Sequence, residues 1–477
     1  MTLRISLALT LLAATPAFAQ PAPKPSAPPQ PPKPAAAAQP AVDDGGFDKD
    51  LDRLFASGGL TSDQAASRAA GASPTVRRRA AELEVAIAQA DAASLAFVPV
   101  LSGKASYTRL SPIDPFVLAF MGQNFAIESF KNNYLLETQL VVPISDYLWR
   151  IPKSVNAAKL SAESSRINRR VSEVSAGQDA RLTYYEWVRA QLQVLISERQ
   201  LVQVQKTLEQ FRALAEVQRL SKADLLRVEA QEADAEQQVD QLQNLAHLRE
   251  EQLRLLIGAG SEPLAVGEDI RKDVSGPASG QLDELMKTAK DRRLEFKQID
   301  VGIQAKDSQR DAEKANLLPK LSAFGIADYA DPNQRVFPQQ DVFKFTWQVG
   351  AQLTWTLNDT LASRTADHRI AAETDELRAD RENFERSTRI EVLQAQQQVE
   401  IAQRTLVSSQ KGLAAAEESY RVRRELLAAD RATAVELVDA ETELTRSRIT
   451  ALNARVDLRV ARAQLEHAVG NDTQLGR

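Results

Sequence analysis

The sequence contains no cysteine and only three histidines, and these shortages exclude several kinds of site. Without cysteine there is no disulfide bond, thiolate metal ligand, thiol nucleophile or lipid-modified cysteine. The histidines stand apart in helical patterns, so we expect packing or surface roles for His247, His368 and His467. Glycine-rich phosphate loops and nucleophile motifs are missing as well. We therefore expect no enzyme activity, no metal and no cofactor.

Basic residues are not in excess, and long apolar segments are scarce. Lysine and arginine number 59 against 64 acidic residues, which gives a net charge of −5. Nucleic-acid-binding proteins usually present a strongly basic face, so we expect no nucleic-acid partner. After the N-terminus no stretch is apolar enough for a transmembrane helix, which needs about 20 residues. If the chain enters a membrane, it must do so as strands.

The N-terminus has the pattern of an export signal followed by a linker. One arginine precedes a short apolar run, and Ala17, Phe18 and Ala19 then provide a small-x-small cleavage site. This pattern predicts a signal peptide at residues 1–19. Residues 20–46 are rich in proline and alanine, which favours an extended, solvated linker.

An internal repeat organises the remainder of the chain. FVPVLSGKASY (97–107) matches LLPKLSAFGIA (317–327), and residues 221–231 match residues 433–443 approximately. Each half therefore follows one plan: helix, strand, loop, strand, very long helix, turn and long helix. We expect a first repeat at residues 47–258 and a second repeat at residues 281–470. An inter-repeat linker at 259–280 separates them, and a C-terminal tail at 471–477 follows.

The second strand of the second half has the clearest strand pattern. Trp347, Val349 and Leu353 alternate with polar residues over about ten residues, the length of a tilted strand that crosses a bilayer. Residues 134–142 repeat this alternation in the first half. A soluble, half-buried sheet is the alternative, because such patterns are weak in any single strand.

The strand count predicts an oligomer if the strands span a membrane. The first strand of each half alternates less cleanly, and Phe324 and Ile326 fall on the face expected to be polar. Two strand pairs, at residues 98–144 and 318–357, provide four strands. About eight strands are the fewest that close a barrel, and lipid does not tolerate an open sheet edge. Several copies of the chain would therefore have to share one barrel.

Two segments predict helices of exceptional length. Asp146–Ala215 and Asp359–Leu427 contain almost no glycine or proline, and each would extend roughly 100 Å as a helix. Apolar and small residues recur at spacings of three and four, which indicates coiled-coil packing. Small residues at such positions let helices lie side by side in a curved wall, and a solid bundle is the alternative. The expected contact residues are Leu201, Val204, Leu208, Phe211 and Ala215; Val399, Ala402, Leu406, Ser409, Leu413, Ala416 and Tyr420; and Leu437, Ala440, Leu444, Ser447, Ala451, Ala454, Leu458, Ala461, Leu465 and Ala468.

These features together resemble the outer-membrane efflux protein family, the TolC-like channels. The resemblance covers nearly all of residues 60–470, through the opening helix at 60–93, the strand entries FVPVLSGKASYTR and LLPKLSAFG, and above all the final stretch at 432–470. It implies a mainly α fold with a small β part and two internal repeats. Long antiparallel coiled-coil helices would form an α-barrel, and four strands per protomer would contribute to a shared transmembrane β-barrel.

The resemblance also implies a function and its partners. The protein would be a homotrimeric exit duct of a tripartite efflux or type I secretion system, in the outer membrane of a Gram-negative bacterium with its helical tunnel in the periplasm. Its partners would be outer-membrane lipid, a periplasmic adaptor and an inner-membrane pump. A structural or adhesive coiled-coil protein of the envelope is one alternative, and a periplasmic adaptor is another. Adaptors have β domains flanking one helical hairpin, unlike the two halves seen here.

Site residues follow from the resemblance at the turns between the long helices. In the family the second turn is followed by two inward carboxylates, spaced like Glu436 and Asp439 here. This spacing places both on one helix face, and symmetry would make them acidic rings that favour cations. Asp224 and Arg227 occupy the equivalent places in the first half. A solvated, charged helix face is the alternative.

The turns themselves, near Val217–Lys222 and Ala428–Thr433, would contact the adaptor. The family usually has glycine where Asp430 stands and arginine where Ala432 stands, so this chain departs from the pattern there. Arg431 is adjacent and is included among the gate residues. The expected docking residues are Arg219, Leu220, Ser221, Asp430, Arg431 and Thr433.

The two loops between paired strands differ in length and character. The loop at 109–133 is longer than that at 330–344, and its residues 110–125 are apolar for an exposed loop. We expect both loops to face the cell exterior and the first to fold over the channel mouth.

Overall fold

The structure is a computed structural model, and the predicted signal peptide and most of the predicted linker lie outside the residues it describes. The chain divides into two compact units, Met1–Lys49 and Asp50–Arg477. Helix α1 (Asp44–Leu54) begins in the described part of the first unit. The described residues are 44–113, 116–120, 123–127, 130–218, 221–272, 280–429 and 431–474.

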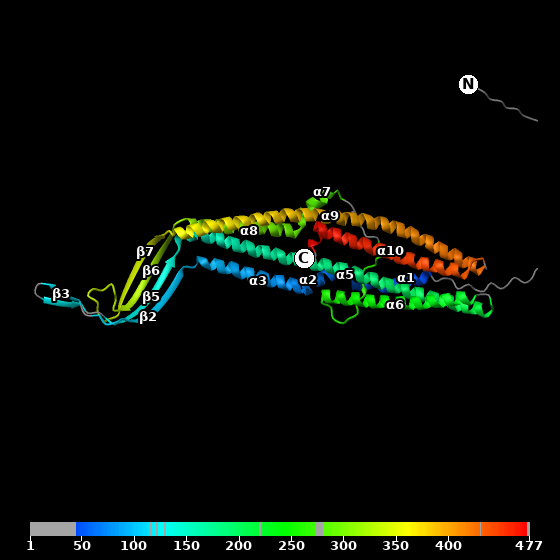
Figure 1. The fold of residues 1–477 in the computed structure, drawn as a ribbon, viewed down its shortest axis with the longest axis horizontal. Coiled ribbons are helices and arrows are strands. Elements are labelled where there is room, and N and C mark those ends of the chain that lie inside the picture. The colour runs from blue at the N-terminus through cyan, green and yellow to red at the C-terminus, as the bar shows by residue number, and fades with distance from the viewer. Residues whose placement is uncertain are drawn as a thin grey trace, which may run out of the picture. The chain divides into compact units, whose positions relative to one another are not determined.

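Four strands form one antiparallel sheet in the order β2–β5–β6–β7 at one end of the second unit (Figure 1). The pairs β2–β5 and β6–β7 are the two predicted hairpins, and pairing of β5 with β6 joins the repeats. Strands β2 and β7 are therefore the two edges of the sheet. The bounds are β2 (Val100–Arg109), β5 (Asn132–Val142), β6 (Lys320–Asp331) and β7 (Lys344–Thr354).

The loop after β2 contains a hairpin that the sequence patterns did not predict. Strand β3 (Phe116–Phe120) pairs with β4 (Gln123–Ile127), and Leu118 lies opposite Phe125. The expectation that this loop narrows the mouth stays a prediction.

The register places the exposed apolar residues Leu101, Leu140, Val349 and their alternate neighbours on one face of the sheet, whereas Val141, Phe324 and Ile326 lie on the other. Gly325 lies between Leu140 and Val349, and directly opposite residues of an antiparallel pair share a face. On this face Trp347 is 64% exposed and Val349 73% exposed. The sheet thus presents a broad apolar surface that no other element of the described chain covers.

Phe324 interrupts the polar opposite face for a local reason. It lies opposite Gly350, and a Cβ atom at Gly350 would lie only 2.7 Å from the Phe324 ring. The ring therefore covers the glycine of the neighbouring strand and is itself half-buried. The expectation of a wholly polar face is wrong at this position.

The two very long helices are confirmed. Helices α5 (Arg150–Glu216) and α9 (Leu357–Ala428) contain 67 and 72 residues, and they return as α6 (Lys222–Ile257) and α10 (Ala434–Val469). A short helix, α4 (Ile144–Leu148), precedes α5, so the first long helix begins later than the predicted Asp146.

The opening helix of each half is broken, a feature that the sequence patterns did not indicate. In the first half α2 (Ser62–Ala72) ends before α3 (Pro74–Ser94), because the residue before a proline avoids the helical conformation. In the second half α7 (Leu282–Arg292) and α8 (Leu294–Lys314) separate at Arg293, whose φ of −66° and ψ of 125° resemble those of Ser73 without any proline. The smaller elements are β1 (Phe55–Leu60), η1 (Leu95–Phe97), η2 (Ala315–Leu317) and η3 (Asn471–Gln474).

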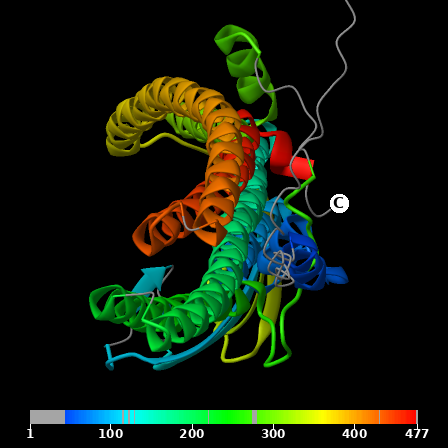
Figure 2. The same cartoon turned by 90° about the vertical axis from the view of Figure 1, so that its right-hand side faces the viewer.

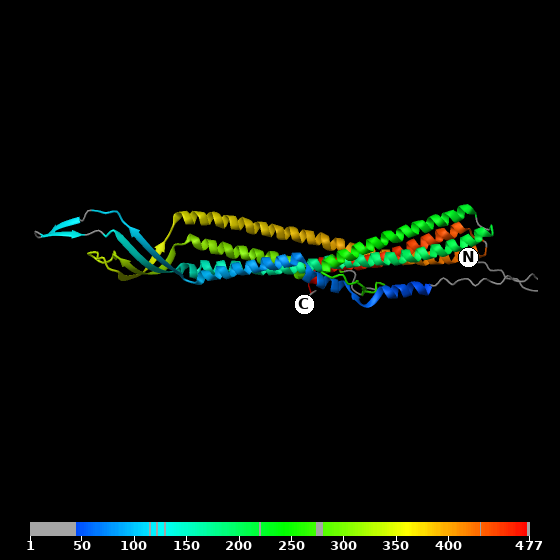
Figure 3. The ribbon, with the colours of Figure 1, turned by 90° about the horizontal axis from the view of Figure 1, so that it is seen from below.

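The long helices of the second unit lie side by side in a curved layer (Figure 2). Toward the helix turns the order is α9, α10, α5 and α6; toward the sheet it is α9, α8, α5 and α3. Helices α5 and α9 thus run through both parts of the layer, and they reach the turn end beside their return helices (Figure 3).

Burial follows the predicted coiled-coil stripes, with one addition. Val399 and Ala402 of α9 pack with Leu458 and Ala461 of α10, as predicted. Helix α10 also buries a second stripe against α5, because it lies between two neighbours instead of one. That second stripe comprises Val438, Glu441, Leu452, Val456, Arg459 and Ala463.

Candidate functional site

The second helix turn is closed by backbone hydrogen bonds and a capping box. After α9 ends, the backbone N–H of Arg431 donates to the carbonyl oxygen of Leu426 at 2.8 Å. Thr433 then caps α10: its hydroxyl accepts from the backbone N–H of Glu436, and the Glu436 carboxylate accepts from the N–H of Thr433. A Thr-x-x-Glu sequence forms this reciprocal pair because both N–H groups lack helical partners.

The first turn uses a related cap. Gln218 adopts a left-handed φ of 59° after α5 ends. Ser221 caps α6 by accepting from the backbone N–H of Asp224 at 3.1 Å, and its hydroxyl donates to the Asp224 carboxylate at 2.6 Å. Asp224 and Glu436, equivalent in the internal repeat, thus both occupy the third position of a capped helix, where an acidic group complements the helix dipole.

Glu436 also forms an ion pair that the sequence patterns did not indicate. Its carboxylate lies 2.7 Å from the Arg423 guanidinium of α9, and the two side chains are 45% and 41% exposed. Solvated pairs of this kind contribute at most about 1 kcal/mol. The pair links the two helices of the second hairpin beside their turn.

Glu436 and Asp439 lie on one exposed face of α10. The same face continues through Glu443, Arg446 and Thr450, at intervals of three and four residues. Within the described residues Asp439 has no ion-pair partner. The face is therefore free to line a water-filled space, which is what the gate prediction requires, and that prediction itself stays untested.

The structure brings some of the predicted site residues together and separates others. Asp224 meets Ser221, and Glu436 meets Thr433, each within its own turn. Arg227 is exposed on α6, and no contact in the described chain joins it to Asp439. Arg219, Leu220 and Asp430 lie outside the described residues.

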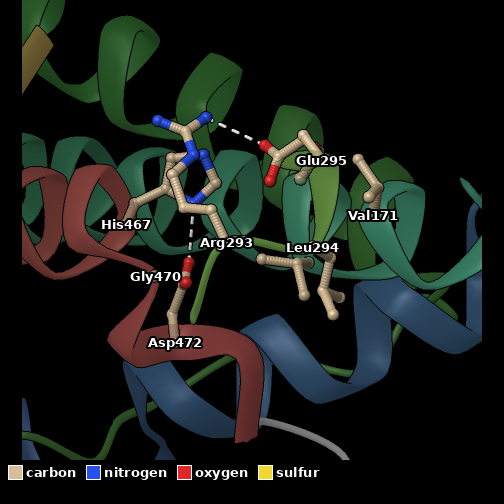
Figure 4. A pocket seen from close by; sticks show the side chains of 9 residues that line it. Val171, Arg293, Leu294, Glu295, His467, Gly470 and Asp472 are labelled. Carbon is tan, nitrogen blue, oxygen red and sulfur yellow. Dashed lines mark hydrogen bonds and ion pairs between the residues drawn. The ribbon is translucent and has the colours of Figure 1, made fainter. Parts of the chain in front are cut away.

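A second cluster lies where α10 ends against the break between α7 and α8 (Figure 4). The Arg293 guanidinium is buried and contacts the carboxylates of Glu295 at 2.8 Å and Glu391 at 2.7 Å. Nearby, His467 Nδ1 lies 2.6 Å from Asp472. Burial lowers the pKa of His467, but the hydrogen bond with Asp472 outweighs this effect and raises it.

The cavity inside this cluster holds about 10 Å³, enough for a single water molecule. It therefore offers no room for a substrate, and its charged groups join the end of α7, the start of α8 and the end of α10 to the middle of α9. The described part of the chain contains no group of three or more acidic, histidine or cysteine side chains that could hold a metal ion. It also contains no helix long and apolar enough to cross a membrane.

Comparison with known proteins found a family model that matches part of the second half of the chain. Residues 285–471 match the model of the outer membrane efflux protein family, which confirms the predicted resemblance. A search of curated proteins found no match.

Solved channel structures share the fold over most of the chain. CusC, described as forming a transmembrane channel, superimposes with a TM-score of 0.71 at 16% identity, covering 87% of this chain and 93% of CusC. The CmeC outer membrane channel of Campylobacter jejuni gives 0.69 at 13% identity, covering 90% and 88%. VceC, an outer membrane protein of Vibrio cholerae, gives 0.67 at 15% identity, covering 88% and 96%. The predicted fold class is thus confirmed.

Proposed function

Given an outer membrane efflux protein region at residues 285–471 and the channel fold throughout, we propose that this protein is an outer-membrane exit duct. It serves a tripartite efflux or type I secretion system as a passive conduit and catalyses no reaction. Its sheet lies in the outer membrane of a Gram-negative bacterium, and its helices form a tunnel in the periplasm.

The apolar face of the sheet is the observation that carries this proposal. The four strands contain 10 to 12 residues, the length that crosses a bilayer when tilted. Trp347, Val349 and Leu353 are each more than 60% exposed on that face, a surface that water disfavours and lipid accepts. A structural coiled-coil protein would have no need of such a face.

Oligomerisation follows from the edges of the layer. Strands β2 and β7 leave their outer backbone groups unpaired, which lipid does not tolerate. The helices at the edges also carry exposed apolar side chains: Val85 of α3, Leu255 of α6, and Ile390 and Ile401 of α9. Edge-to-edge packing between copies closes both the sheet and the helical wall, and the family resemblance favours three copies.

The turn end of the helices contacts the periplasmic adaptor, which links the duct to an inner-membrane pump. The exposed stripe with Glu436 and Asp439 lines the lumen there and favours cations, because a ring of like charges in a narrow space concentrates counter-ions.

Mass measurement of the detergent-solubilised protein tests the proposal. We expect a trimer that resists extraction without detergent and conducts ions in planar bilayers. A folded monomer that is soluble without detergent would contradict the proposal and favour an envelope coiled-coil protein. Extraction as a trimer without conductance would instead leave a membrane-anchored structural role.

A further inference from the structure

One carboxyl group is buried near the helix turns without a charged partner. Glu441 on α10 is 4% exposed, and its Oε1 atom has no hydrogen-bond partner in the described chain. One turn earlier on the same helix, Val438 packs with Val204 and Leu208 of α5. Glu441 therefore sits in the apolar contact between the first helical hairpin and the second.

One polar neighbour of Glu441 is a buried hydroxyl on the facing helix. The Thr207 hydroxyl of α5 is 3% exposed and hydrogen-bonds with Glu441. The same hydroxyl also lies 3.1 Å from the carbonyl oxygen of Gln203, to which it can donate instead. The hydrogen bond with Thr207 lowers the pKa of Glu441, whereas burial, the larger effect, raises it, so the surroundings of the carboxyl as a whole favour the protonated form.

Two pairs of charged groups on the packed helices form ion pairs with each other. Arg423 of α9 pairs with Glu436, and Arg212 of α5 pairs with Glu229 of α6 at 3.5 Å. Burial raises the pKa of Glu441 to about 7. The other titratable groups on neighbouring turns are Lys206 and Glu209 of α5, Tyr420 and Arg424 of α9, and Glu443 and Arg448 of α10.

We propose that the contact of Glu441 with Thr207 is a proton-dependent link between the two helical hairpins, closed while Glu441 is protonated and loosened when it ionises. Other polar contacts also join these hairpins. Near the turns, Gln203 of α5 donates to the Tyr420 hydroxyl at 3.1 Å and Gln231 of α6 donates to the Thr442 hydroxyl at 3.4 Å, both between neutral groups. Further from the turns, Arg189 of α5 pairs with Asp457 of α10 at 2.6 Å. Loosening beside the turns would let them separate while the distant pair holds. Control of a channel opening by this link rests on the proposed function, whereas the pH dependence of the contact does not.

The direction of the pH effect follows from the raised pKa. A carboxyl whose pKa is higher in the closed contact than in water stabilises the contact fully below about pH 4.5, and this contribution is lost as the pH rises through about 7. Between pH 6 and pH 8 the ratio of open to closed contact should rise about tenfold.

The internal repeat supplies a matched control. Glu229 is the equivalent of Glu441 in the first half, but it is solvated and paired with Arg212. Replacing Glu229 with glutamine should leave the contact between the hairpins unchanged. Replacing Glu441 with glutamine keeps the shape of the side chain and removes the ionisation.

Spin labels provide a direct measurement because the chain has no native cysteine. Cysteines at the exposed positions Lys206 and Glu443 of the full-length protein in detergent report the separation of α5 from α10. In the protein with an unchanged Glu441, we expect the population with the longer label-to-label distance to grow about tenfold relative to the short-distance population from pH 6 to pH 8. The Glu229→Gln variant should show the same change. In Glu441→Gln the short distance should persist at both pH values, and Glu441→Met serves the same purpose if the glutamine variant does not assemble.

Two results would overturn the inference: a distance distribution that does not change with pH, or a change that survives in both Glu441 variants. Conductance of the same samples in planar bilayers separates this inference from the channel proposal. A pH-dependent distance without conductance would retain the link and reject the channel. Conductance together with a distance that does not change with pH would retain the channel and reject the link.

Discussion

The two helical hairpins share a backbone plan but differ in what their equivalent carboxyl groups contact. Both return helices begin with a hydroxyl cap and an acidic third residue, at Ser221 and Asp224 and at Thr433 and Glu436. Both end in glycine with a left-handed φ, at 64° for Gly258 and 76° for Gly470.

The contacts of the two hairpins differ five residues after Asp224 and Glu436, at Glu229 and Glu441. Glu229 reaches Arg212 in solvent, whereas Glu441 is buried against α5. The reason is position in the layer: α6 has a neighbour on one side only, and α10 lies between α9 and α5. The repeated sequence sets the start and end of each helix, and the number of neighbours decides whether a given side chain is solvated.

The largest effect is expected where the sheet presents its two unlike faces. Val349→Lys places a charge at the middle of β7 on the apolar face, at a cost of about 2–4 kcal/mol per copy in a bilayer. We expect loss of the membrane-inserted oligomer, measured by heat-resistant migration of outer-membrane extracts. Gln348→Lys, one residue earlier on the polar face, should assemble normally. Equal assembly of both variants would mean that the apolar face does not contact lipid while the polar face lines the lumen.

The breaks in the opening helices give the next comparison. Arg293→Ala leaves Glu295 and Glu391 without their buried cation and should lower the free energy of unfolding by about 3 kcal/mol. This is the low end of the range for a broken buried ion pair, because water can still solvate Glu391. Ser73, at the equivalent break, makes no side-chain cap bond, so Ser73→Ala should change it by less than about 0.5 kcal/mol. Urea denaturation in detergent checks the pair, and similar midpoints would show that the charge cluster does not stabilise the junction.

The caps of α6 and α10 should behave alike. Ser221→Ala and Thr433→Ala each remove one side-chain acceptor and should cost about 1 kcal/mol. Hydrogen exchange of the first-turn amides should accelerate roughly fivefold in both variants. Thr450→Ala, further along α10, is the control and should leave exchange of the first-turn amides unchanged. Faster exchange in only one of the two cap variants would show that the two turns are not equivalent.

The smallest effect on stability concerns the exposed charges beside the turns. Glu436→Gln with Asp439→Asn keeps the capping geometry and loses one solvated ion pair, so stability should fall by less than about 1 kcal/mol. Cation selectivity in planar bilayers should nevertheless decline, most clearly at low salt. Arg227→Gln on the first hairpin should shift selectivity the other way. Unchanged selectivity in both would mean that these residues face the outside of the wall.

Much of the fold was accessible from the sequence because its signals are periodic and local. Alternation from Phe345 to Leu357 predicted β7, which spans Lys344–Thr354, and the scarcity of glycine and proline predicted α5 and α9 nearly to their ends. The break at Arg293 was missed because no proline follows it to indicate the end of a helix. The hairpin of β3 with β4 was missed because its short apolar strands lack a clear alternation.

The sequence by itself determined the lengths of the elements, their caps and the apolar stripe of each helix, since these depend on residues within a few turns of one another. The tertiary structure alone decided which neighbours each stripe meets. Glu436 meets Arg423 and Glu441 meets Thr207 because α9, α10 and α5 lie adjacent in one layer, and these contacts join residues 13 to 234 positions apart in the sequence. Burial of Glu441, and with it the raised pKa, is therefore a property of packing that no local pattern specifies.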